Sequence, residues 1–239
     1  MLNLLRESSH NNDILVFYDS KKKKYYKISS TQYGNNLIQN ELNGIIFFNK
    51  LSHQKKIIYE LYKKKNYRRL KIDKIYGKIA DYNGSFYENS KYFEKVVNFY
   101  FIKWPNVKKQ IAHGDLTLDN ILFNKDKFTI FDWEHFTKSR ELFFGYDIIY
   151  FLLSGIILPG DSKFDLNSKE KFKKLYKRLY DYKIDKYYLD NPFKCIDKII
   201  SNVFTHILLK SPNKFITISI NKKFKNKILN FMDKEVFNK

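Results

Sequence analysis

The chain has 239 residues, enough for one large domain or two small lobes, and its 44% hydrophobic and 18% aromatic residues exclude a disordered chain despite 29% charged residues. The single cysteine, Cys195, excludes an internal disulfide and a metal site built on thiolates. The formal net charge of +20, from 45 Lys+Arg against 25 Asp+Glu, favours phosphates, nucleic acid or anionic membranes as partners, although the lysines are spread along the whole chain.

The first 30 residues predict a small antiparallel arrangement of strands. Short runs rich in β-branched and aromatic residues alternate with polar turns such as the lysine turn at residues 20–23. Such runs are typical of strands joined by hairpins. We therefore predict three strands, at residues 3–6, 13–19 and 24–29.

A helix and a further hairpin are predicted next. Residues 34–50 carry Ile38, Leu42 and Ile45 at helical spacing, and asparagines at the start could cap the helix. Residues 57–63 and 67–75 then flank a polar turn and predict two more strands. The segment at 76–82 follows as a connection to the rest of the chain.

The remaining residues predict helices around one central hairpin. Residues 121–123 and 128–131 are apolar runs separated by a polar link, and they predict two paired strands. Pro105 ends a helix whose aromatic residues recur at helical spacing. The predicted helices cover residues 89–104, 142–158, 168–182, 192–209 and 222–237.

We expect a cytoplasmic protein. Cys195 suits a reducing compartment, and residues 1–6 are too short for a signal peptide. The longest apolar run, at 142–158, is interrupted by Asp147 and two glycines and falls short of the roughly 20 residues needed to span a bilayer. We interpret this run as a buried helix.

Four polar residues around the central hairpin point to chemistry. His113, Asp115 and Asn120 precede the hairpin, and Asp132 follows its second strand. Phosphoryl transfer needs a carboxylate that orients the attacking hydroxyl and oxygen ligands that hold Mg²⁺ against the nucleotide phosphates. The hairpin would fold Asn120 back towards Asp132, so these residue types in this order predict a phosphoryl-transfer site.

Three motifs carry a family resemblance: HGDLTLDN (113–120), FDWEHF (131–136) and GYDIIY (145–150). Their order and spacing resemble the aminoglycoside phosphotransferase and choline kinase superfamily. The resemblance implies that Asp115 is the catalytic base, that Asn120 and Asp132 are Mg²⁺ ligands, and that His113 shapes the catalytic loop. It makes Asp147 structural and assigns no role to Glu134.

The order of strands and helix in the first 75 residues is similar to that of a kinase small lobe. By this likeness Lys27 occupies the strand position that contacts nucleotide phosphates, and Glu41 occupies the position of its ion-pair partner on the helix. A solvated edge-strand charge is the alternative for Lys27. Residues 8–13 contain no glycine, which departs from the glycine-rich phosphate loop of protein kinases. The segment at 76–82 would be the hinge that meets the purine.

We therefore predict an α+β, two-lobed, protein-kinase-like fold. Residues 1–80 would form an antiparallel-sheet, nucleotide-binding lobe, and residues 81–239 a mainly helical lobe with the catalytic loop and the acceptor site. The predicted function is Mg²⁺-dependent transfer from ATP (or GTP) to a hydroxyl of a small molecule, either an amino alcohol such as choline or ethanolamine or a sugar of cell-surface glycan synthesis. An anionic membrane surface is a further partner to consider.

Three alternatives remain at this point. A nucleotide-binding pseudokinase would keep the fold without turnover, and the missing glycine loop motivates it. A basic nucleic-acid-binding protein would account for the charge and for lysines interleaved with Tyr and Phe, but it leaves the three motifs unexplained. A protein kinase would need an activation loop, which the aromatic-rich stretch at 132–147 does not offer.

Overall fold

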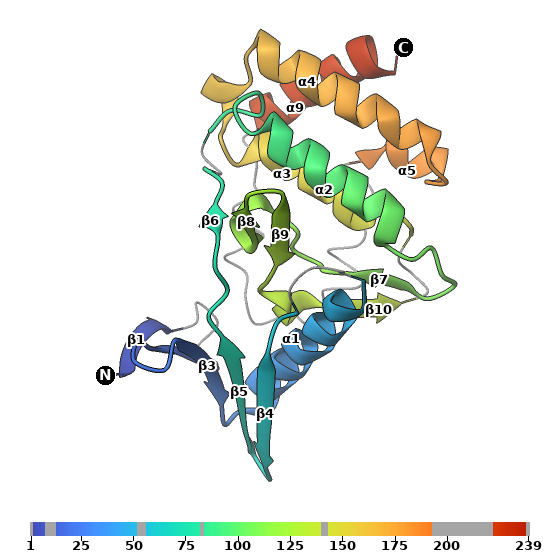
Figure 1. The fold of residues 1–239 in the computed structure, drawn as a ribbon. Coiled ribbons are helices and arrows are strands. Elements are labelled where there is room, and N and C mark those ends of the chain that lie inside the picture. The colour runs from blue at the N-terminus through green and yellow to red at the C-terminus, as the bar shows by residue number, and fades with distance from the viewer. Residues whose placement is uncertain are drawn as a thin grey trace.

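The computed structural model describes residues 2–7, 13–51, 56–81, 84–139, 143–192 and 222–237. An antiparallel sheet with one long helix lies at one end of the molecule, and a group of helices lies at the other (Figure 1). A short hairpin, β8–β9, lies between them (Figure 1). This architecture confirms the predicted α+β, kinase-like fold class, whereas the boundary at residues 80 and 81 stays a prediction.

The N-terminal sheet is formed by five antiparallel strands in the order β1-β2-β3-β5-β4. All five strands were predicted from the sequence, with shifts of a few residues at their ends. An ion pair of 2.5 Å between Lys24 and Asp73 joins β3 to β5 at the end where the chain leaves the sheet. The strands are β1 (Leu2–Glu7), β2 (Leu15–Asp19), β3 (Lys24–Ser29), β4 (Tyr59–Lys64) and β5 (Tyr67–Asp73).

Helix α1 (Gln32–Leu51) packs its apolar face against this sheet. The predicted start at residue 34 is wrong, because Thr31 caps the helix: its Oγ1 accepts a hydrogen bond of 3.0 Å from the Gly34 N–H. Leu37, Ile38 and Ile45 are almost fully buried. Burial of each such side chain stabilises the fold by roughly 1.5–3 kcal/mol, which anchors the helix that carries Glu41.

The central strands are short. Strands β8 (Ile121–Asn124) and β9 (Lys127–Ile130) pair as the predicted hairpin, with Lys125 in a left-handed turn conformation at φ 52°. Strand β6 (Lys78–Ile79), inside the predicted hinge segment, adds to β8, and β7 (Gln110–Ala112) pairs with β10 (Thr137–Ser139). These three short strands were not predicted.

The C-terminal helices appear in the predicted order where the structure describes them, with one addition, a short helix at Lys186–Asp190 that was not predicted. The predicted helix at 142–158 begins later, at Tyr146, because Gly145 adopts φ 101° immediately before it. The predicted helix at 168–182 ends earlier and continues as a 3₁₀ turn, and that at 192–209 lies almost wholly outside the described residues. The helices are α2 (Ser90–Lys103), α3 (Tyr146–Ile157), α4 (Leu166–Lys177), α5 (Lys186–Asp190) and α9 (Lys222–Phe231), which continues as a π-helical turn (Met232–Val236).

Helix α3 is the centre of the helical core. It is buried on all sides, as its largely apolar sequence predicts despite Asp147, and its residue Gly155 lies directly against the ring of Phe93 on α2. Phe93 stacks on Phe86 at 4.2 Å between ring centroids and contacts Phe151 at 4.9 Å. Within the described residues, no helix is long and apolar enough to cross a membrane. The close packing of α3 fixes the position of Asp147 and Tyr150, which face the site.

Candidate active site

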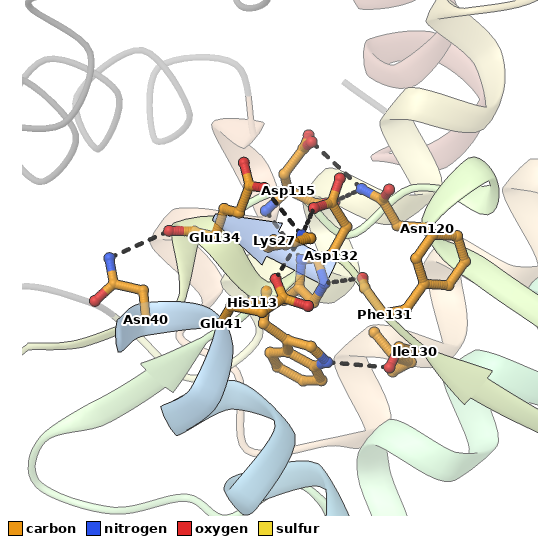
Figure 2. A network of polar contacts seen from close by, with 11 residues as sticks. Lys27, Asn40, Glu41, His113, Asp115, Asn120, Ile130, Phe131, Asp132 and Glu134 are labelled. Carbon is orange, nitrogen blue, oxygen red and sulfur yellow. Dashed lines mark hydrogen bonds and ion pairs between the residues drawn. The ribbon is translucent and has the colours of Figure 1, made fainter. Parts of the chain in front are cut away.

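The β8–β9 hairpin brings the beginning and the end of the site together. The backbone N–H of Phe131 donates a hydrogen bond of 3.0 Å to the carbonyl of Asn120, so the hairpin ladder continues to the residues on either side of it. Asn120 ends a 3₁₀ turn (Leu118–Asn120), and Asp132 follows Phe131 directly. The structure therefore places Asn120 and Asp132 side by side, as predicted from the spacing (Figure 2).

The loop between β7 and the hairpin is held by His113 and Asp147. The carboxylate of Asp147 accepts the backbone N–H groups of His113 at 2.8 Å and Gly114 at 3.1 Å. The His113 ring accepts the Asp115 N–H at Nδ1, which leaves Nε2 to donate to the carbonyl of Phe131 at 3.0 Å. Both ring nitrogens are therefore engaged with the backbone, and this geometry supports a loop-shaping role for His113.

Burial dominates the electrostatics of this pair. Removal from water lowers the pKa of His113 to about 4, so its ring is neutral near pH 7. Burial raises the pKa of Asp147 to about 7, although the two backbone donors act in the opposite direction. The cost of burying His113 and Asp147 is offset by the hydrogen bonds that both side chains form with the backbone of the loop.

Asp115 lies at the open side of this loop. The hydroxyl of Tyr150 donates to Asp115 Oδ1 at 3.1 Å, and the Asn120 amide donates to the Asp115 carbonyl at 2.7 Å and to Oδ2 at 3.3 Å. Because the amide nitrogen of Asn120 faces Asp115, its side-chain oxygen faces away from that residue. Asp115 is thus held in one orientation but stays partly exposed.

Lys27 connects the sheet to this site. Its ammonium group lies 2.9 Å from Asp132 Oδ1, 2.9 Å from Glu134 Oε1 and 3.2 Å from Glu41 Oε2 (Figure 2). Burial disfavours the charged ammonium, but the three carboxylates outweigh this effect and hold the pKa of Lys27 well above its usual value. Burial likewise raises the pKa of Glu41 to about 7, against the opposing influence of Lys27. Lys27 is therefore not the solvated edge-strand charge considered as its alternative.

The segment after Asp132 is tightly constrained. Asp132 adopts a left-handed backbone conformation, φ 61° and ψ 57°, and opens a 3₁₀ turn (Trp133–His135). Such a conformation costs a non-glycine residue of order 1–2 kcal/mol and persists only where the surroundings fix it. The next residue, Trp133, fixes the backbone of Asp132, because it is fully buried and its indole N–H donates to the Ile130 carbonyl at 3.0 Å. Asn40 of α1 donates to the backbone carbonyl of Glu134 at 3.2 Å and so ties the turn to the helix.

Three carboxylates surround the single ammonium group of Lys27, so this cluster carries a net negative charge. The side chains of Glu41, Asp132 and Glu134 each have an oxygen within 4.8 Å of the others, and within the described part of the chain Lys27 is the one cation that contacts all three. An oxygen-rich, net negative set of this kind fits a hard divalent cation such as Mg²⁺. The donor set therefore suits the metal that the sequence motifs imply.

Two residues of the candidate active site, Glu134 and Tyr150, were not predicted to have a role there. Glu134 was left without a role, although its position two residues after Asp132 places both carboxylates on one turn. Tyr150 was not singled out, although it follows Asp147 by one helical turn and the same helix presents both residues to the loop. The predicted roles of Asp115, His113, Lys27, Glu41, Asn120 and Asp132 stay predictions, while the structure brings all six into one cluster.

Several solved structures of other proteins resemble this chain over nearly its whole length. The GDP and kanamycin complex of APH(2")-IIia aligns with a TM-score of 0.52 and 11% identity and covers 96% of this chain and 93% of that chain. The GDP complex of a mutant aminoglycoside 2'-phosphotransferase-IIIa gives 0.54 and 12%, covering 100% and 92%. This chain has the fold of the aminoglycoside phosphotransferases.

A further structure with the phosphotransferase fold is amicoumacin kinase hAmiN with AMP-PNP, Ca²⁺ and Ami, with a TM-score of 0.50 and 13% identity, covering 95% and 88%. No family model and no curated protein matches the sequence. At identities of 11 to 13% the likeness establishes the fold. The resemblance inferred from the three motifs is confirmed at that level, and the activity has to be argued from the site.

Proposed function

We propose that this protein transfers the γ-phosphoryl group of ATP or GTP to a hydroxyl group of a small molecule. The observation that carries the proposal is the ion pair between Lys27 of the sheet and Asp132 at the hairpin, 2.9 Å apart although 105 residues separate them. This pair would bring together a cation for the nucleotide phosphates and an oxygen ligand for Mg²⁺. Asp115 and Asn120 complete the set of groups that phosphoryl transfer needs.

Asp115 would act on the acceptor. The acceptor oxygen attacks the γ-phosphorus, its proton passes to the Asp115 carboxylate, and the bond to the bridging oxygen breaks to release the nucleoside diphosphate. Tyr150 and Asn120 hold the carboxylate in place, so little reorganisation is needed as the reaction proceeds. Lys27 would neutralise charge on the phosphates, and Glu41 would hold Lys27 in position.

Asn120 and Asp132 would hold Mg²⁺, with Glu134 as a further oxygen ligand from the same turn. The ion would supply charge neutralisation along the nucleotide phosphates. Glu134 is included because its carboxylate lies within reach of Asp132 and shares Lys27 with it.

The acceptor class rests on the motifs. The Asp-Trp-Glu segment and the Tyr-Asp helix resemble enzymes that act on choline or ethanolamine, or on sugars of cell-surface glycans, more than drug-resistance enzymes. An amino alcohol or such a sugar is therefore the proposed acceptor, and the net charge of +20 would favour a substrate at an anionic membrane surface. A cytoplasmic location is part of the same proposal.

The test is Mg²⁺-dependent transfer from labelled ATP and GTP to a panel of choline, ethanolamine, sugars, glycan precursors and aminoglycosides. Asp115→Asn should abolish transfer to the accepted substrate, whereas Asp126→Asn, at the exposed tip of the hairpin, should not change it. Nucleotide binding without any transfer or hydrolysis would favour the pseudokinase. Absence of nucleotide binding, with salt-dependent binding of mixed-sequence RNA, would favour the nucleic-acid-binding protein.

A further inference from the structure

A cavity of about 540 Å³ lies beside the segment that links β5 to β6. Four stretches line it: the β2–β3 turn, the approach to β4, the β5–β6 link and the β8–β9 hairpin. None of the residues that contact Lys27 or Asp115 is among its lining. Asp73 of its wall pairs with Lys24, three residues before Lys27 on β3, which is a separation of roughly 10 Å along the strand. This cavity is distinct from the catalytic cluster.

The cavity is strongly basic. Its lining includes five lysines, from all four stretches: Lys22, Lys23, Lys56, Lys74 and Lys127. Its single carboxylate is already engaged, because Asp73 pairs with Lys24 at 2.5 Å. Among the described residues, no carboxylate forms an ion pair with any of the five lysines. Like charges gathered around one hollow repel each other, and an anion bound between them would relieve that repulsion.

One of these lysines is held in position. The ammonium group of Lys74 lies over the rings of Tyr18 and Tyr76, 5.6 Å and 5.5 Å from their centroids. Its backbone N–H donates to the Lys23 carbonyl at 2.9 Å, which also fixes the β2–β3 turn against the β5–β6 link. The basic wall is therefore partly preorganised, which lowers the cost of binding an anion.

The inner part of the cavity is apolar. Ile57 and Phe128 are buried, and Ile75 and Leu122 are partly buried beside them. A single inorganic phosphate would fill little of a hollow whose volume is in the range of small-molecule sites, roughly 300–1,000 Å³. The lining thus fits a molecule with an apolar portion and more than one negative charge.

We propose that this cavity binds a phosphate-bearing ligand, with its phosphate groups among the five lysines and its apolar portion against Ile57 and Phe128. The ligand could be a soluble organic diphosphate or the headgroup region of an anionic phospholipid, since both offer the same chemistry. The proposal does not depend on the phosphotransferase activity, because the phosphate groups of the ligand would contact none of Lys27, Asp115, Asn120 and Asp132. Tyr76 of the lining belongs to the segment at 76–82, the purine hinge by the kinase likeness, and nucleotide is therefore left out of the test.

The experiment measures pyrophosphate binding to the full chain by calorimetry, without Mg²⁺ or nucleotide and at fixed ionic strength. The test variant is Lys22→Gln with Lys127→Gln, and the control is Lys174→Gln with Lys183→Gln, two exposed lysines far from the cavity in sequence that remove the same charge. We expect roughly tenfold weaker binding in the test variant and none of that loss in the control, because charge-assisted contacts to phosphate are local.

A second arm distinguishes the sources of the ligand. Co-sedimentation with vesicles of phosphatidylcholine containing phosphatidic acid, lost in the test variant and kept in the control, would support the phospholipid. Pyrophosphate binding without vesicle binding would support the soluble diphosphate. Equal losses in test and control variants, or no binding of either probe, would overturn the proposal.

Discussion

Gly44 of α1 lies directly against Trp133, the residue that follows Asp132. A β carbon on Gly44 would lie 2.6 Å from Trp133 Cδ2, well inside van der Waals contact. Glycine is a poor helix former, so its presence in the middle of α1 is accounted for by this close approach. The contact sets the distance between the helix that carries Glu41 and the turn that carries Asp132 and Glu134.

Gly44→Ala should destabilise the protein by about 1–3 kcal/mol, because the added methyl group overpacks the contact with Trp133. In a solvent-exposed helix the same change would stabilise by about 1 kcal/mol, so the sign of the effect tests the contact. Urea unfolding measures it, with Lys50→Ala on the exposed face of α1 as the control. A stabilised Gly44→Ala protein would contradict the observed packing.

Lys27→Met should destabilise the fold in a pH-dependent manner. Without the ammonium, Glu41, Asp132 and Glu134 repel each other, and the pKa of Glu41, which burial already raises, loses the lowering influence of Lys27 and rises further. A raised carboxyl pKa contributes stability below the unfolded value and loses it as the pH rises through the folded value, which for Glu41 is already about 7. We expect a small loss at pH 5 and a loss of about 3 kcal/mol at pH 8.

Urea unfolding of this variant at both pH values, relative to the unmodified protein, tests the expectation. Lys64→Met on β4 is the matched control, since Lys64 is exposed and should show little change at either pH. A loss independent of pH would show that the three carboxylates do not share the charge of Lys27.

His113 should titrate far below an ordinary histidine. Its folded pKa of about 4 lies below the usual 6.5, so the unfolded chain binds one more proton between these values. The contribution of His113 to stability is therefore complete above pH 6.5 and is lost as the pH falls through 4. NMR titration of the ring should show a neutral Nε2–H tautomer down to about pH 4 in the native protein and a midpoint near 6.5 in urea. A midpoint near pH 6.5 in the native protein would contradict a buried ring whose two nitrogens both form hydrogen bonds.

Glu134→Gln should raise the Mg²⁺ concentration needed for half-maximal phosphoryl transfer by about tenfold, because one charged oxygen ligand is lost while the size of the side chain is kept. Transfer measured over a series of Mg²⁺ concentrations at saturating nucleotide tests this. Glu170→Gln, on the exposed face of α4, should leave the curve in place. An unchanged Mg²⁺ dependence in Glu134→Gln would remove this residue from the proposed ligand set.

Local patterns predicted most of the elements. The five strands of the sheet, α1, α2 and the β8–β9 hairpin have clear periodicity and turn residues, and they appear where expected. The start of α1 was misplaced because the cap is the hydroxyl of Thr31 rather than an asparagine. The two- and three-residue strands β6, β7 and β10 are too short to show any periodicity.

The site was predictable only as a set of residue types in order. The position of Asn120 beside Asp132 follows from a hairpin, which is a local feature. The sharing of Lys27 among Glu41, Asp132 and Glu134 depends on how α1 packs on the turn after the hairpin, and no spacing in the sequence encodes that packing. The five-lysine cavity joins four stretches that are distant in the chain, and was hidden for the same reason.

The packing of Gly44 on Trp133 also has a consequence for synthesis on the ribosome. Residues 2–73 supply the five strands of the sheet, yet the helix that covers it also packs against a turn at 133–135. Until that turn has left the exit tunnel, the part of α1 around Gly44 lacks its contact with Trp133, and Lys27 has only Glu41 of its three carboxylates. The N-terminal part therefore cannot complete its packing during translation until the hairpin and its turn have been synthesised.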